Sequence, residues 1–396
     1  MTPPPCLPHD HPRHTLTARQ ALGLMLTLAA LLSGCASQAP EAPVAASTVA
    51  TTPPPSPVAE EATTKAIPAP TEVQTQTIDP GGYTQRDDAR QLADQLARDF
   101  GLDAAWVRSA MDQARYKDNV AKFIMPAPAG TAKNWAAYRS RFVEPVRIKA
   151  GVAFWRANEA ELRRAEARWG VPASIIAGVI GVETIYGRQT GNFRLLDALT
   201  TLSLDFPKGR SDRSAFFQKE LGHFLKLCSE QKMDPTSVLG SYAGAMGLPQ
   251  FMPSSVRSFA IDFDGDGRVD LLSSPVDAIG SVARYLAEHG WERDMPIYYD
   301  VTPPADTASL LKLLAPDIVP SFTVTEMQDL GARLPDVAQN HTALLALVKL
   351  ENGEGAPTLI AGTDNFYTIT RYNQSSYYAL AVIQLGQAVA REARYP

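Results

Sequence analysis

The stretch Gly178-Val-Ile-Gly-Val-Glu-Thr-Ile-Tyr-Gly187 places one carboxylate in an otherwise apolar run with the periodicity of a helix. Ile176, Val179 and Ile180 precede Glu183 by seven, four and three residues, so the four side chains share one helix face. Such a face normally enters a core, where loss of water favours a protonated carboxyl group. The negative end of the helix dipole acts in the same direction. The pattern therefore predicts a general acid, the alternative being a solvated or ion-paired boundary residue.

From about residue 85 onward the chain has mostly helical periodicity. Pro172 suits the first turn of the helix that carries Glu183, and Gly187 suits its end. Late in the chain, runs of β-branched and aromatic residues predict a small sheet. We therefore predict a mostly helical α+β protein. The predicted helices cover 88–100, 103–115, 134–142, 146–170, 172–186, 214–231 and 376–393, and the predicted strands lie within 297–305, 320–325, 343–350 and 357–369.

The amino terminus has the features of a bacterial lipoprotein signal peptide. The apolar run Ala21–Leu32 follows two arginines and is too short to span a bilayer as a helix. Leu32-Ser-Gly-Cys35 resembles a lipobox, and Ala36 stands where an Asp would signal inner-membrane retention. We expect residues 1–34 to be removed and a lipid on Cys35 to anchor the chain at the periplasmic face of a Gram-negative outer membrane. A soluble secreted protein with a chance Cys is the alternative.

Residues 35–84 have the composition of a tether. Pro, Ala, Thr and Val dominate residues 36–80, which include no aromatic residue, so this stretch cannot form a packed core. We expect it to be extended or disordered, with a reach of roughly 40 Å as a random coil. It would let the folded part, residues 85–396, search the layer above its membrane.

The mature chain carries more acidic than basic side chains. Without residues 1–34 it keeps 35 Lys and Arg and 41 Asp and Glu, a formal net charge of −6. This balance argues against binding of nucleic acid and against a polybasic membrane patch. Apart from Cys35, the only cysteine left is Cys228, so we expect no internal disulfide. Its apolar helical surroundings predict a buried, inert thiol.

The segment Asp262-Phe-Asp-Gly-Asp-Gly-Arg268 has the spacing of the first half of an EF-hand calcium loop. Ser273 stands where the closing Glu is usual, and Asp277, in the helix that Pro275 begins, could reach back instead. We predict a structural Ca²⁺ site within 262–277 and no organic cofactor, the alternative being an Asx-rich turn without metal. The predicted ligands are the carboxylates of Asp262, Asp264, Asp266 and Asp277 and the backbone carbonyl of Arg268.

Six motifs follow one another in a fixed order behind the lipobox. Together they resemble the membrane-bound lytic murein transglycosylase B family, over about residues 85–396. The resemblance implies a lysozyme-like core with an α-helical domain and a small β-containing subdomain. The motifs are Gly181-Val-Glu-Thr-Ile-Tyr-Gly187, Gly244-Ala-Met-Gly247, Gln250-Phe-Met-Pro-Ser-Ser255, the loop at Asp262, Val276-Asp-Ala-Ile-Gly280 and Thr370-Arg-Tyr-Asn373.

The resemblance also implies a reaction. These enzymes cut the β-1,4 bond between N-acetylmuramic acid and N-acetylglucosamine, and the 6-hydroxyl of the muramic acid closes a 1,6-anhydro ring. Ordinary glycosidases need a second carboxylate as nucleophile or base. Here the nucleophile belongs to the substrate, so effective molarity replaces part of that help. Glu183 would act alone, first as general acid and then as base.

Substrate contacts follow from the resemblance by position. Gln250 and Phe251 would form the floor beneath the sugar at the cleavage point. Members of the family commonly carry paired arginines after Phe-Pro or Tyr-Pro, whereas this chain has an insertion in Phe206–Arg213. Arg213 is the best match for one of them, and Arg210 or Lys208 is a candidate for the other. The remaining matches to cleft positions are Tyr138, Ser241, Tyr285, Tyr372, Asn373 and Tyr378.

Two other functions stay open. A hydrolytic muramidase on the same fold would need a carboxylate opposite Glu183 to activate water. A non-catalytic peptidoglycan-binding lipoprotein would have no need of an acid with a raised pKa. For the leading interpretation we expect peptidoglycan glycan strands as the binding partner, the outer membrane as the anchor, cell-wall synthesis complexes as candidate further partners, and a monomer.

Overall fold

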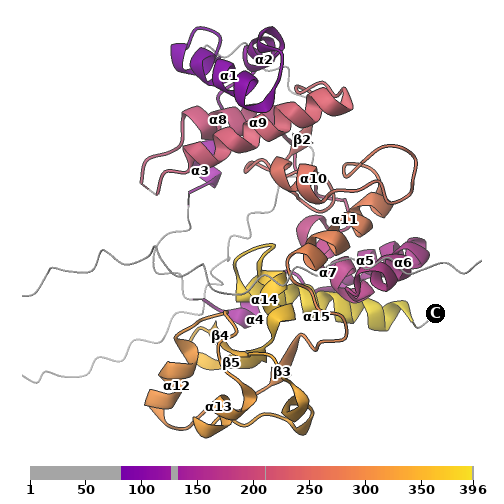
Figure 1. The fold of residues 1–396 in the computed structure, drawn as a ribbon, viewed down its shortest axis with the longest axis vertical. Coiled ribbons are helices and arrows are strands. Elements are labelled where there is room, and N and C mark those ends of the chain that lie inside the picture. The colour runs from indigo at the N-terminus through magenta and orange to yellow at the C-terminus, as the bar shows by residue number, and fades with distance from the viewer. Residues whose placement is uncertain (1–81, 126–132, 210, 395–396) are drawn as a thin grey trace, which may run out of the picture. The chain divides into compact units, whose positions relative to one another are not determined.

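The structure, a computed structural model, describes residues 82–125, 133–209 and 211–394 (Figure 1). The leader, Cys35 and almost all of the tether lie outside the described residues. Within the described part, no helix is both long and apolar enough to cross a membrane.

The first helices pack around the long helix α9 (Ser214–Gln231). Helix α1 (Asp87–Phe100) ends at Gly101, whose φ of 59° is left-handed, and Asp103 then caps α2. Helix α1 contacts both α2 and α9, and α8 packs against α9 (Figure 1). These contacts make one apolar interior. The other helices of this part are α2 (Ala104–Met111), α3 (Asp118–Phe123) and α8 (Leu195–Leu204).

Helix α7 (Ala173–Thr184), which carries Glu183, forms the centre of the second group of helices. All of its residues except Ser174 and Glu183 are buried. Helix α15 (Ser376–Ala393) packs closely along it (Figure 1). Gly386 permits this approach, because a Cβ there would lie 1.9 Å from the carbonyl oxygen of Ser174. The neighbouring helices are α4 (Trp135–Ser140), α5 (Pro145–Ala157), α6 (Glu159–Trp169), α10 (Pro253–Phe259), α11 (Pro275–Glu288) and α14 (Asp364–Thr370).

Three predicted helices differ from the structure. The helix predicted over 103–115 ends at Met111 in α2. The single helix predicted over 146–170 is wrong, because the chain breaks at Asn158 (φ −126°, ψ 23°) into α5 and α6. Helix α7 ends before Gly187, since Ile185 and Tyr186 both adopt left-handed φ values, 51° and 57°. Non-glycine residues with left-handed φ values carry backbone strain, and such strain is concentrated at functional sites.

The late part of the chain forms a small antiparallel sheet in the order β3-β5-β4. Its strands are β3 (Tyr298–Asp300), β4 (Ala346–Asn352) and β5 (Gly355–Gly362). Helices α12 (Thr307–Leu314) and α13 (Val324–Asp329) and the 3₁₀ turn η1 (Asp336–Asn340) help enclose a second apolar cluster with the sheet. A separate two-stranded pair joins β1 (Phe193–Arg194) to β2 (Leu239–Gly240).

Three strand predictions were too long. The strand predicted within 297–305 is only β3, Tyr298–Asp300. The strand predicted over 320–325 reduces to a single bridge, Phe322 with Leu345. Thr323 and Glu326 then form a capping box that begins α13. The strand predicted over 357–369 ends at Gly362, after which α14 begins.

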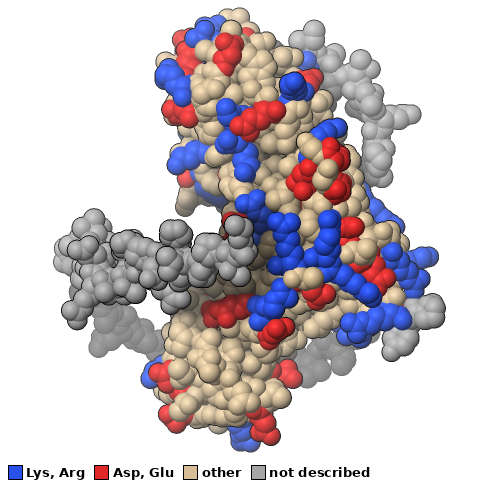
Figure 2. Space-filling view, turned by 45° about the vertical axis from the view of Figure 1, so that its right-hand side comes forward, with Lys and Arg blue, Asp and Glu red and all other residues tan. Residues whose placement is uncertain are grey.

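Basic and acidic side chains are interspersed on the face that Figure 2 shows, with a broad band of Lys and Arg across it. On α6, Arg163 pairs with Glu159 at 2.6 Å and Arg164 pairs with Glu161 at 2.5 Å. Exposed pairs of this kind contribute little to stability. The fold therefore rests on its apolar interior.

Candidate active site

Glu183 stands on the last turn of α7 and is only partly exposed. Its Oε1 accepts a hydrogen bond from the hydroxyl of Tyr378 at 2.6 Å. Loss of water raises the pKa of Glu183 to about 7, although the bond from Tyr378 lowers it. The carboxyl group thus titrates near neutral pH, in the direction that the sequence predicted.

Three tyrosines surround this carboxyl group. The rings of Tyr372, in the turn after α14, and of Tyr378, in the first turn of α15, stack with centroids 6.2 Å apart. Burial raises the pKa of both and of Tyr138, and the negative charge of Glu183 adds to each rise. The fold therefore gathers three predicted cleft tyrosines around the acid, and it leaves Asn373 exposed beside them.

The loop that carries Gln250 is tied to the end of α7. Thr184 donates its hydroxyl to the carbonyl oxygen of Leu248 at 2.9 Å. Gln250 has a left-handed φ of 50° and donates its side-chain amide to the carbonyl oxygen of Thr190 at 3.1 Å. Thr184 and Thr190, which follow Glu183 in sequence, thus position the loop that carries Gln250.

Phe251 and Tyr285 lie deeper than expected. Phe251 is only 2% exposed, and its ring packs on Tyr285 and Tyr372, with centroid separations of 5.4 and 5.8 Å. Tyr285 is 9% exposed and donates its hydroxyl to the carbonyl oxygen of Arg371 at 2.9 Å. Both rings thus pack against Tyr372, and their contact with substrate stays a prediction.

Ser241 and Arg213 come from other segments. Ser241 is partly exposed, and its hydroxyl accepts the backbone N–H of Ala245 at 3.0 Å. Arg213 is exposed just before α9, with its guanidinium 4.5 Å from the ring centre of Phe216. Among the described residues, no recorded contact links Arg213 to the three tyrosines. Arg210 lies outside the described residues.

One supporting residue was missed in the sequence. Arg147 donates from Nη1 to the carbonyl oxygens of Gly181 at 2.7 Å and Val182 at 3.1 Å. A cation at the carboxyl end of a helix is favoured by the helix dipole. The ring of Tyr186 occupies the space that Gly151 and Gly181 leave without side chains. An Arg within a helix gives no sequence signal that it caps another helix.

The acidic loop brings three carboxylates together but not the fourth. Asp277 is buried, and its two oxygens accept the backbone N–H groups of Phe263 at 2.8 Å and Asp270 at 2.7 Å. The prediction of Asp277 as a direct ligand is therefore corrected: its carboxylate joins the two ends of the loop. The side chain of Arg268 is exposed. Carboxylate oxygens within 4.8 Å of one another come from Asp262, Asp264 and Asp266.

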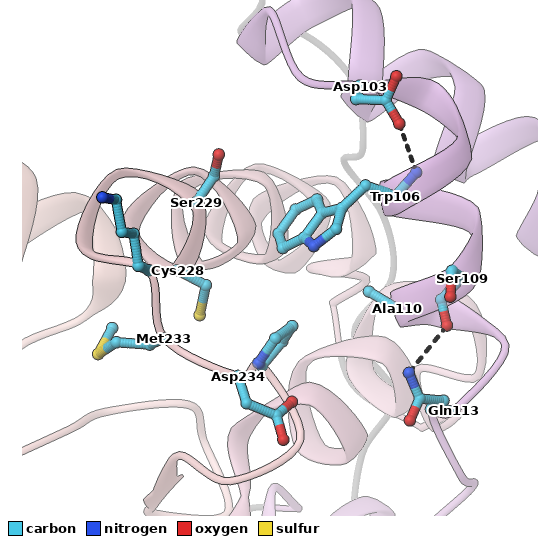
Figure 3. Close-up of a pocket in the computed structure, with 11 residues that line it drawn as sticks. Asp103, Trp106, Ser109, Ala110, Gln113, Cys228, Ser229, Met233 and Asp234 are labelled. Atoms are coloured by element: carbon cyan, nitrogen blue, oxygen red, sulfur yellow. Dashed lines mark hydrogen bonds between the residues drawn. The ribbon is translucent and has the colours of Figure 1, made fainter.

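Two hollows lie away from Glu183. One of about 430 Å³ opens between α2 and the carboxyl end of α9 (Figure 3). The other, of about 370 Å³, shares Met233 and Asp234 with it. Glu183 lines neither of them.

The chain is similar to known lytic transglycosylases over most of its length. The family model described as a transglycosylase SLT domain matches residues 84–387. Membrane-bound lytic murein transglycosylase B of Escherichia coli K12 is 38% identical over 322 residues, which are 78% of this chain and 84% of that protein.

Solved structures agree with this assignment. Soluble lytic transglycosylase SltB1 from Pseudomonas aeruginosa has a TM-score of 0.69 and 40% identity, covering 77% of this chain and 99% of its own. The Escherichia coli lytic transglycosylase Slt35 in complex with calcium has a TM-score of 0.68 and 37% identity, covering 80% and 99%.

A mostly helical, lysozyme-like fold around one protonatable carboxyl group defines an enzyme that cleaves glycan chains. The chain belongs to the transglycosylase SLT domain family and is a lytic transglycosylase acting on peptidoglycan.

Proposed function

We propose that this enzyme cleaves the β-1,4 bond between N-acetylmuramic acid and N-acetylglucosamine without water, with Glu183 as its single acid and base. The observation that carries the proposal is the setting of Glu183. Its pKa is about 7, its bonded partner is the neutral hydroxyl of Tyr378, and among the described residues no second carboxylate contacts it.

In the first step the protonated carboxyl group of Glu183 gives its proton to the glycosidic oxygen, and the N-acetylglucosamine leaves. In the second step the same group, now a carboxylate, takes the proton of the 6-hydroxyl as that oxygen bonds to C1. The product ends in 1,6-anhydro-N-acetylmuramic acid. Tyr378 would stabilise the carboxylate between the two steps, because its hydroxyl already donates to Oε1.

Borohydride treatment of digested sacculi tests this reaction. Borohydride reduces free sugar aldehydes and leaves anhydro ends unchanged, so the released fragments should resist reduction. Fragments that are reduced would favour the hydrolytic muramidase, and a second carboxylate would have to reach Glu183. Binding to sacculi without release would favour the non-catalytic lipoprotein.

The pH dependence of turnover should report the titration of Glu183. A general acid must be protonated, so kcat/KM should fall as pH rises through about 7. The hydrogen bond from Tyr378 lowers the pKa of Glu183, so Tyr378→Phe should move this falling limb to higher pH. Rates on soluble muropeptides across pH 5 to 9 measure the falling limb of the wild type and that of Tyr378→Phe.

Tyr367→Phe serves as the control, because its hydroxyl interacts with Arg371 on the exposed side of α14. Its pH profile should match the wild type. A Tyr378→Phe profile with an unmoved limb would show that another group sets the pH dependence.

We propose that the acidic loop binds Ca²⁺ through Asp262, Asp264 and Asp266 and the carbonyl oxygen of Arg268. Three carboxylates whose oxygens lie within 4.8 Å repel one another unless a cation offsets their charge. Asp277 would act behind these ligands by fixing both ends of the loop. The metal would therefore join α10 to α11 and have a structural role.

Calcium should raise the melting temperature. At one hundred times its dissociation constant, a ligand of the folded state adds about 2.7 kcal/mol, which is roughly 5 °C or more for a domain of this size. Scanning calorimetry with calcium and with EGTA gives the rise in melting temperature that calcium causes. The double variant Asp264→Asn with Asp266→Asn should lose this rise. The exposed Asp329→Asn should keep it, and an increment retained in the double variant would refute the site.

The place of the protein in the cell is also a proposal. A lipid on Cys35 would hold the enzyme at the periplasmic face of the outer membrane, and the Pro-rich segment after it would give the enzyme reach into the peptidoglycan. Cys35→Ala should release the protein into the soluble periplasmic fraction.

A further inference from the structure

The hollow between α2 and the end of α9 has an aromatic wall. Figure 3 shows the indole of Trp106 reaching across from α2, with Met233 and Cys228 on the opposite side. Trp106 is only partly buried, and within the described part of the chain no hydrogen bond satisfies its indole N–H. A half-exposed indole offers an apolar face and one free donor, which suits a ligand with both apolar and polar surface.

Two carboxylates on the rim of this hollow are held in place by their own turns. Asp103 accepts the backbone N–H of Trp106 at 2.7 Å. Asp234 accepts the backbone N–H and the hydroxyl of Thr236, each at 2.8 Å, and these bonds lower the pKa of Asp234. A carboxylate has about four acceptor sites, so each keeps acceptors for a ligand. Fixed acceptors lose little entropy when they bind.

The hollow continues beside these carboxylates. The second hollow, of about 370 Å³, shares Met233 and Asp234 and extends to Thr190. The carbonyl oxygen of Thr190 accepts the amide of Gln250, so this end borders the loop described at the active site. The two hollows together offer more room than one sugar ring needs, in the volume range of small-ligand sites.

The chemistry of the rim selects a neutral, hydroxyl-rich ligand. Asp103 and Asp234 accept hydrogen bonds from hydroxyl and amide groups, and together they outweigh the single cation Lys232, which disfavours phosphates and other anions. Ser109 and Ser229 add hydroxyls that donate and accept. The face of a pyranose ring is apolar and matches the indole, whereas its edge matches this rim.

We propose that this hollow is an accessory binding site for N-acetylglucosamine units of a glycan strand, separate from the site at Glu183. The choice of ligand rests on the proposed function, because the strand is taken from it. A second attachment point on the same polymer raises the effective concentration of the strand at the active site. The resulting gain in affinity applies to long strands and whole sacculi, and it is absent for fragments too short to reach both sites.

Two variants test the accessory site in the mature, otherwise intact chain. Trp106→Ala removes the aromatic wall. Ser229→Trp fills the hollow from an exposed position and removes nothing from the core. Lys219→Ala, exposed elsewhere on α9, is the matched control. Circular dichroism checks that each variant keeps its helices, and Ser229→Trp keeps the test valid if Trp106→Ala does not fold.

Binding to purified sacculi is measured by sedimentation, and cleavage is measured on a soluble tetrasaccharide muropeptide. Both pocket variants should bind sacculi about tenfold more weakly, cleave the tetrasaccharide at the wild-type rate, and lose chemical-shift changes at the hollow on titration with chitotetraose. Sacculus binding equal to wild type in both variants would overturn the accessory site. Failure of the proposed function has a different signature: no wild-type cleavage of the tetrasaccharide, whatever the sacculus binding.

Discussion

Glu183→Gln should abolish turnover of sacculi and of soluble muropeptides, by roughly 10³-fold or more. The substitution keeps the size of the side chain and an acceptor for the hydroxyl of Tyr378, but it removes the transferable proton. Because no second carboxylate contacts Glu183 among the described residues, no other described group is placed to take over either step. Initial rates at the pH optimum of the wild type measure the loss.

The fold should survive this change and gain stability at high pH. Folding raises the pKa of Glu183 from 4.5 to about 7, so the folded state binds this proton more tightly than the unfolded state. The resulting stability is complete below the unfolded pKa and is lost as pH rises through about 7. Glu183→Gln should therefore melt at or above the wild-type temperature at pH 8. A lower melting temperature there would attribute the lost activity to misfolding.

Gly386→Ala should destabilise the enzyme by roughly 3 kcal/mol, the upper part of the range for overpacked cores. Helix propensity alone predicts the opposite, a gain of about 1 kcal/mol for Ala over Gly. The clash decides, because the new Cβ would lie 1.9 Å from the backbone oxygen of Ser174, which cannot rotate away. Relief requires α15 to move off α7, and α15 carries Tyr378. Activity should fall along with stability.

Gln387→Ala is the control for this prediction. It is the next residue on α15, is exposed, and changes propensity without entering the core. Chemical denaturation should leave it within about 0.5 kcal/mol of the wild type. A Gly386→Ala protein of wild-type stability would mean that the two helices are not in contact at this glycine.

Local signals predicted the parts of the fold that depend on periodicity and caps. The helices over 214–231 and 376–393 begin and end as predicted, because their apolar faces are continuous. Ser274 caps α11 and Pro275 begins it, as the acidic loop and its flanks indicate. Glu183 was singled out from its apolar neighbours on the helix, and the structure buries those neighbours. The burial of Glu183 itself raises its pKa, in the predicted direction.

Features that depend on tertiary packing were beyond these signals. No proline or glycine marks the break at Asn158, so the helical periodicity of the sequence continues through it. Phe251 and Tyr285 look like cleft aromatics in sequence, and only the folded structure shows that their rings pack on Tyr372. Trp106 and Asp234 are far apart in sequence, and they meet only because α2 packs near the end of α9.

Digestion of sacculi in water enriched in ¹⁸O tests the central claim most directly. If the 6-hydroxyl of the substrate is the nucleophile, no oxygen from water enters the product. The muramic acid ends released by the wild type should then carry no ¹⁸O and should have the mass of the anhydro form. Incorporation of one ¹⁸O per cleavage would show that water attacks C1, and it would contradict the assignment of Glu183 as the only acid and base.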